Sequence, residues 1–168
     1  GIYQRLLRFV EETYPGGQAK VELYEDPLLP LSKLFSLEAA IGEALDKRVW
    51  LKSGGFLVIE QTEACAVIDV NSGKYVAKRD TGEMAARINR EAVREILRQI
   101  RLRNLSGIIL VDFINMNQEE QEQLLALMRG LAKEDRITTR AVDVTELGIM
   151  ELTRRKEKKT LAQQLEEL

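Results

Sequence analysis

The sequence contains no histidine and only one cysteine, Cys65. Without histidine the chain lacks the most common general base, any Ser-His-Asp triad and the usual nitrogen ligands of zinc. A single cysteine excludes a disulfide framework and a cysteine-rich zinc site within one chain, and we expect Cys65, which lies in an apolar run, to be a small buried side chain. Catalysis would therefore depend on carboxylates, amides, hydroxyls, Lys or Arg, or on a metal ion bound by oxygen.

Long apolar runs and a large excess of one charge are absent as well. Every apolar run is far shorter than the roughly 20 residues that span a bilayer, and the N-terminus lacks the basic-then-apolar layout of a secretory signal. We expect no membrane span and a cytoplasmic location, and the first residue, Gly1, indicates a processed chain or an excised fragment. The net charge is −2, so binding of nucleic acid would require cations gathered on one face.

Some segments alternate apolar and polar residues like strands, and others repeat apolar residues at helical spacing, so the sequence predicts an α/β protein. The expected helices lie at 2–13, 32–47, 83–102 and 117–133, the expected strands lie at 19–24, 48–51, 56–60, 64–70, 107–113 and 137–144, and a mostly helical segment follows from 147. From residue 56 onward the order β-β-α-β-α-β-α predicts a largely buried mixed sheet with flanking helices, preceded by a small partial α/β segment.

Two of the expected strands end in an aspartate. The apolar residues 64–68 lead into Asp69, and the apolar residues 108–111 lead into Asp112. The long helix between them predicts a β-α-β crossover, which sets the strands parallel and close together, with both aspartates at the edge where ligands of open α/β sheets bind. Two carboxylates there suit Mg²⁺, and Asn71 would point the same way and orient a water or a phosphate oxygen. The alternative is that each aspartate merely caps the turn after its strand.

The helix expected at 83–102 carries a stripe of arginines. Five of them fall within an arc of about 80° of the helix surface: Arg87, Arg90, Arg94, Arg98 and Arg101. Glu91 and Glu95 can pair with two of these, and the remaining positive charge suits a phosphate backbone. The alternative is a solvated face with weak ion pairs.

Aromatic residues are few near this expected site. The candidates are Phe56, Tyr75 and Phe113, and Phe113 is expected to pack in the core. We find no interleaved basic and aromatic motif of the kind that stacks single-stranded bases.

Three stretches resemble the ribonuclease E/G family: SGGFLVIEQTEACAVIDVNSGK (53–74), INREAVREILRQIRLRNLSGIILVDFINM (88–116) and TELGIMELTRRK (145–156). The resemblance runs almost continuously from about residue 20 to 158, and the IDVNSG and VDF elements at this separation are highly specific. It implies an Mg²⁺-dependent endoribonuclease, with Mn²⁺ as a substitute ion, that cuts single-stranded RNA in RNA processing or decay and leaves a 5′-phosphate. The two catalytic, metal-binding aspartates of the family match Asp69 and Asp112, and its supporting asparagine matches Asn71.

The resemblance also implies domain boundaries. Residues 53–156 match a catalytic, deoxyribonuclease-I-like subdomain, residues 1–52 match the latter half of a ribonuclease-H-like subdomain, and residues 157–168 would form a C-terminal helical tail.

The sequence departs from the family pattern in several places. The OB-fold RNA-binding domain, the sensor for the RNA 5′ end and the CPxC-type zinc link of the family have no counterpart in this chain. Thr138 stands where the family has an RNA-contacting arginine, for which Arg136 or Arg140 would compensate. Asn115 stands where an aspartate is common.

Two other functions stay open at this point. An RNA-binding module with little or no turnover is favoured by the missing RNA-gripping domains, because positioning is a large part of phosphoryl-transfer catalysis. A phosphohydrolase of small molecules would use the same acidic edge, although the arginine stripe favours a polymer. The incomplete N-terminal sheet would leave strand edges unpaired, so we also predict self-association into a dimer or larger oligomer by swapping of residues 1–50.

Overall fold

In the computed structural model, which describes residues 1–13, 21–73 and 81–167, the chain divides into two units, Gly1–Ile41 and Gly42–Leu168. The first unit contains the helices α1 (Ile2–Thr13) and α2 (Leu31–Leu34) and the start of α3 (Leu37–Leu45). No residue of α1 or α2 is buried. The first unit therefore contributes little to the hydrophobic core of the protein.

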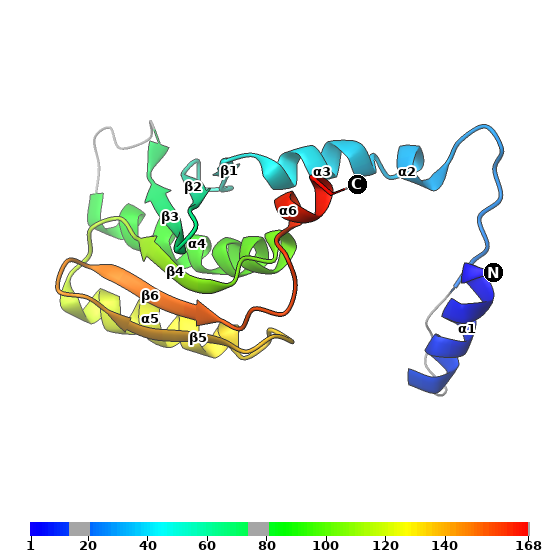
Figure 1. The fold of residues 1–168 in the computed structure, drawn as a ribbon. Coiled ribbons are helices and arrows are strands. Elements are labelled where there is room, and N and C mark those ends of the chain that lie inside the picture. Colours follow the sequence, from blue (N-terminus) through cyan, green and yellow to red (C-terminus); the bar gives the residue numbers. More distant parts are fainter. Residues whose placement is uncertain (14–20, 74–80, 168) are drawn as a thin grey trace. The chain divides into compact units, whose positions relative to one another are not determined.

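The second unit contains one mixed sheet and the remaining helices (Figure 1). Its elements are β1 (Arg48–Trp50), β2 (Phe56–Gln61), β3 (Cys65–Asn71), α4 (Thr81–Arg103), β4 (Gly107–Asp112), α5 (Gln118–Ala132), β5 (Thr139–Val144), β6 (Ile149–Arg154) and α6 (Leu161–Leu165). The strand order is β1-β2-β3-β4-β6-β5; β3 and β4 are parallel, and the other neighbours are antiparallel. The predicted fold class, a mixed α/β sheet with flanking helices, is confirmed.

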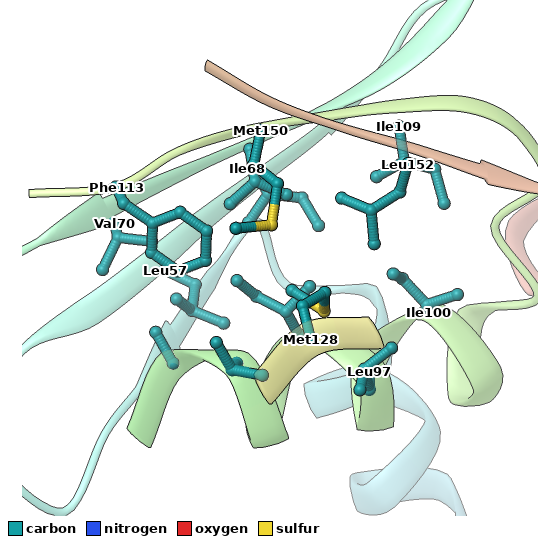
Figure 2. Packing of buried hydrophobic residues seen from close by; sticks show 14 of the residues in the cluster. Leu57, Ile68, Val70, Leu97, Ile100, Ile109, Phe113, Met128, Met150 and Leu152 are labelled. Atoms are coloured by element: carbon teal, nitrogen blue, oxygen red, sulfur yellow. The ribbon is translucent and has the colours of Figure 1, made fainter. Parts of the chain in front are cut away.

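Helices α4 and α5 pack on the same face of this sheet. Figure 2 shows Ile68, Ile109 and Leu152 of the sheet pointing toward Leu97 of α4 and Met128 of α5. All five side chains are at most 2% exposed. The hydrophobic core thus lies between the sheet and these two helices.

The opposite face, which we call the open face, is lined by the alternate residues of each strand. Val67 of β3 is 37% exposed and Ile108 of β4 is 52% exposed. The expectation of a largely buried sheet is therefore wrong, because the apolar runs 64–68 and 108–111 contain outward-facing residues that α4 and α5 do not reach. Cys65 is also on this face and is only half-buried, against our expectation of a buried thiol.

The segment after residue 147 is not mostly helical, because it contains strand β6. Met150 and Leu152 are buried and alternate with the more exposed Ile149, Glu151 and Thr153, which is the period of a strand. A turn with Gly148 at a φ of 85° reverses the chain after β5, and β6 then pairs with both β5 and β4.

The helix expected at 32–47 is interrupted. It forms as α2 and α3, with Ser36 between them at a φ of 49°, a backbone conformation that ends a right-handed helix. The strand expected at 19–24 is absent from its described part, residues 21–24. Within the described ranges, no helix is both long enough and apolar enough to cross a membrane.

Candidate catalytic site

The two aspartates predicted at strand ends lie directly opposite each other. β3 and β4 pair in parallel with Asp69 in register with Asp112, and α4 is the crossover helix between them. Both aspartates are exposed, whereas the flanking Ile68, Val70 and Val111 are buried. Because side chains alternate across a strand, the two carboxylates share the open face, on neighbouring strands roughly 4.8 Å apart.

Asn71 lies on the same face as Asp69 and contacts it. Its Nδ2 donates a hydrogen bond of 2.8 Å to Oδ2 of Asp69. This bond fixes the orientation of one carboxylate oxygen, and the side-chain oxygen of Asn71 still has acceptor capacity. The sequence predicts that Asn71 lies beside Asp69, but the hydrogen bond between them is visible only in the structure.

The turn between β1 and β2 lies against the end of β3. A Cβ on Gly55 would stand 2.7 Å from the carbonyl oxygen of Asn71, and one on Gly73, which has a φ of 67°, would stand 2.5 Å from that of Gly54. Real side chains do not tolerate such distances, so glycine at both positions lets the turn approach the strand. The backbone next to Asn71 is thereby fixed by a close contact.

Glu91 of α4 holds the same turn from the other side. Its carboxylate accepts hydrogen bonds from the backbone N–H groups of Lys52, at 2.7 Å, and Ser53, at 3.1 Å. Burial favours the neutral form of this carboxyl, but the hydrogen bonds from the turn and the charge of Arg87 outweigh burial and lower the pKa of Glu91. Glu91 thus anchors the turn rather than neutralising Arg94.

The chain that follows Asp112 is held by Asn89, a residue of α4 that sequence analysis missed. Asn89 is 1% exposed; its Nδ2 donates to the carbonyl of Ile114 at 2.8 Å, and its Oδ1 accepts from the N–H of Ile114 at 3.1 Å. Helical spacing puts Asn89 in the same apolar stripe as Val93 and Ile96. A polar residue in a buried stripe needs a hydrogen-bond partner, and this is the feature of the sequence that could have identified Asn89.

The paired carboxylates offer the ligands of a hard cation. Within the part of the chain that the structure describes, His, Cys, Asp and Glu side chains form no cluster of three or more. Two carboxylates on an exposed surface do not make a zinc site or a calcium cage. They match the one or two carboxylates plus several waters that Mg²⁺ prefers, so Asp69 and Asp112 fit this ion.

The arginine stripe is not brought together with the acidic pair. Arg87, Arg90, Arg94, Arg98 and Arg101 are all exposed. They lie on the outer side of α4, and α4 covers the sheet face opposite to the open face. Arg98 pairs with Glu95 at 2.7 Å. An RNA segment at the acidic pair would have to pass around the sheet to reach the stripe.

Arg136 and Arg140 are exposed and line a shallow pocket of about 570 Å³ beside β5. Arg129 and Lys133 of α5, which sequence analysis did not select, line it as well, together with Thr138. Four cations therefore gather there, a charge suited to phosphate.

The aromatic candidates separate into different environments. Phe113 is 5% exposed and packs in the core, as predicted. Tyr75 lies outside the described residues. Phe56 pairs with Asn71 across β2 and β3, and it contacts Trp50 of β1, which sequence analysis did not consider.

Comparisons with known proteins give matches to one family. Residues 1–157 match the model of the ribonuclease E/G family. The chain is 40% identical over 161 residues to ribonuclease G of Escherichia coli K12, covering 95% of this chain and 32% of that protein. It is 42% identical over 155 residues to ribonuclease G of Haemophilus influenzae, covering 91% and 31%, and 41% identical over 150 residues to ribonuclease E of Nostoc, covering 87% and 22%. The chain thus spans less than a third of the length of these relatives.

Proposed function

Because the chain belongs to the ribonuclease E/G family, we propose that it carries the catalytic centre of an Mg²⁺-dependent endoribonuclease that hydrolyses phosphodiester bonds of single-stranded RNA. The observation that carries this proposal is the register of Asp69 with Asp112 on parallel strands of an open sheet face. RNA processing or decay in the cytoplasm is the setting that such an activity predicts.

Asp69 and Asp112 are the residues that would hold the ion. Bound there, Mg²⁺ would polarise the scissile phosphate and lower the pKa of a water, and Mn²⁺, which accepts the same oxygen ligands, would substitute. Asn71 keeps Asp69 oriented through its 2.8 Å hydrogen bond, and its side-chain oxygen would orient the attacking water. The exposure of both carboxylates leaves room for a phosphate of the RNA on the open face.

We assign the catalytic work to residues 53–156, as a deoxyribonuclease-I-like subdomain. Arg136 and Arg140, with Arg129 and Lys133 beside them, would bind the RNA backbone farther along the molecule. The arginine stripe of α4 would bind a separate segment of RNA, because it lies on the other side of the sheet.

A second candidate is an RNA-binding module with little turnover. It is favoured by the arginine stripe of α4, which is exposed and lies away from the acidic pair. RNA bound there would not be positioned at Asp69 and Asp112, and positioning of the RNA supplies a large part of the rate in phosphoryl transfer.

Cleavage of a labelled single-stranded RNA by the pure chain tests the proposal. We expect cutting in Mg²⁺, none in EDTA, and a loss of about a hundredfold or more in Asp112→Asn and in Asp69→Asn, since even residues that only support metal ligands contribute about 10–100-fold. Asp143→Asn, at an exposed position of β5, is the matched control and should cut normally.

The same assay separates the two candidates. If none of the proteins cuts but all of them bind the RNA, the binding module is correct. If Asp112→Asn cuts as fast as the unchanged chain, the acidic pair is not the catalytic centre.

A further inference from the structure

Arg48, Trp50 and Phe56 form a contiguous group on β1 and β2. The rings of Trp50 and Phe56 are 5.2 Å apart between centroids and tilted by 58°. The guanidinium carbon of Arg48 lies 4.5 Å from the Phe56 centroid and 5.8 Å from the Trp50 centroid. Both distances are within the range of cation–π attraction, so the three side chains support one another.

This group lies on the open face, beside the acidic pair. Val49, between Arg48 and Trp50, packs against the core, so its two neighbours point the other way. Trp50 pairs with Phe56, and Phe56 pairs with Asn71. Two strand spacings, about 10 Å, thus separate Trp50 from Asn71, and this equals the rise of about three stacked nucleotides.

The ring of Trp50 is open to a ligand, whereas that of Phe56 is not. Trp50 is 65% exposed, but Phe56 is half-buried and covered by the Arg48 guanidinium. An exposed tryptophan is costly in water, and it is the only tryptophan in a chain with 5% aromatic residues. An aromatic face next to a fixed positive charge is complementary to a nucleobase followed by its phosphate.

We propose that Arg48, Trp50 and Phe56 are a stacking platform for a base of single-stranded RNA that positions the adjoining phosphates at Asp69 and Asp112. The inference rests on the proposed nuclease function and adds to it the residues that select unpaired bases. Stacking on Trp50 accepts any base, because every base has a π-face. A duplex does not offer a free face, so the platform discriminates against paired RNA.

Stacking of a base on Trp50 can be followed by tryptophan fluorescence, because Trp50 is the only tryptophan of the chain. The experiment titrates the Asp112→Asn chain, which leaves RNA uncut, with a short single-stranded oligoribonucleotide and with an abasic strand of equal length and charge. We expect quenching by the first and little by the second. Equal quenching by both would mean that charge alone acts, and a signal that changes only with protein concentration would mean that a second copy covers Trp50. Either result overturns the platform.

Substitutions supply the second readout. Trp50→Ala should bind the oligoribonucleotide about tenfold more weakly by anisotropy, the size expected for one stacked base, and Trp50→Phe should retain most of the affinity. Phe35→Ala removes an aromatic side chain of matched exposure, 66%, and should bind normally.

The outcomes for the platform and for the nuclease are distinguishable. If cleavage depends on Asp112 while Trp50→Ala and Trp50→Phe bind and cut like the unchanged chain, the platform fails and the nuclease stands. If no protein cuts but Trp50 is quenched and Trp50→Ala loses affinity, the platform stands and the nuclease fails.

Discussion

At the scale of single residues, a buried ion pair joins three segments of the second unit. Nε of Arg154 lies 2.8 Å from Oδ2 of Asp135, and both side chains are 3% exposed. Arg154 also donates to Asn104 and to the carbonyl of Leu105. Arg154 is therefore structural, and it ties the turns before β4 and β5 to the end of β6.

The ionisation of Asp135 makes stability depend on pH. Burial favours its neutral form, but hydrogen bonds from Arg154, Thr139 and the N–H of Ile137 outweigh burial and lower its pKa. Between the folded and the unfolded pKa of Asp135 the unfolded chain binds more protons than the folded chain, so the free energy of unfolding rises with pH. The stabilisation by the ionised Asp135 carboxylate is fully present above the unfolded pKa of about 3.9. It is lost as the pH falls through the lower folded pKa.

Asp135→Asn should therefore be less stable by about 3 kcal/mol at neutral pH, because a buried arginine loses its partner. The difference from the unchanged chain should shrink below about pH 4, measured by urea unfolding at a series of pH values. Glu134→Gln, at the exposed neighbouring carboxylate, is the control. A difference that stays constant from neutral to acid pH would show that Asp135 does not act through its charge.

The role of a single residue could be predicted only where the neighbouring residues in the sequence indicate it. Asp69 and Asp112 could be found because each ends its own apolar run. Trp50 could not be assigned, because its neighbours Phe56 and Asn71 come from two other strands, and register between strands is not visible in one segment. Asn89 left only a weak signal, since its partner, Ile114, lies across the crossover.

At the scale of elements, α4 has two faces with separate tasks. Its buried face covers the sheet, and its arginines face outward, away from Asp69 and Asp112. Phosphate contacts on the outer face would add affinity without touching the reacting bond.

Replacing Arg90 and Arg94 by glutamine should reduce the slope of log affinity against log salt by about 1.4, since each contact to single-stranded RNA contributes about 0.7. The cleavage rate at saturating RNA should not change. Filter binding at several salt concentrations measures the slope, and Arg5→Gln with Arg8→Gln, exposed on α1, is the matched control. The same slope in both double variants would mean that the stripe is only a solvated surface.

Helices and strands whose periodicity, caps and turns all lie within their own segment were predicted correctly. The β2–β3 hairpin, α4 and α5 formed as expected, and α5 begins with the capping box of Asn117 and Glu120. β6 was missed because Leu147 and Met150 also fit helical spacing, and what makes the segment a strand is the unpaired edge of β4. Such a preference depends on a distant partner and cannot be read from the segment itself.

At the scale of the whole molecule, the first unit exposes many apolar side chains. On α1 alone, Ile2 is 76% exposed, Leu6 is 47% exposed and Phe9 is 58% exposed. These three residues recur at helical spacing and form one apolar stripe. An exposed apolar stripe of this kind favours association, which supports the predicted self-association through residues 1–50.

Light scattering over a range of concentrations should therefore give a mass that rises toward a dimer or larger oligomer. Leu6→Ser combined with Phe9→Ser should lower that mass at a given concentration, whereas Gln4→Ser on the same helix should not. A monomer mass at every concentration would contradict the prediction.

The position of β6 between β4 and β5 has a consequence for synthesis on the ribosome. Chains fold from the N-terminal side as they emerge, so β4 can pair with β3 as soon as residue 112 is free. Its other edge, including the backbone opposite Ile149, has no partner until residues 149–154 have been made, which takes several seconds at about 5–20 residues per second. During that interval the free edge of β4 is where a chaperone, or a second nascent chain, would bind.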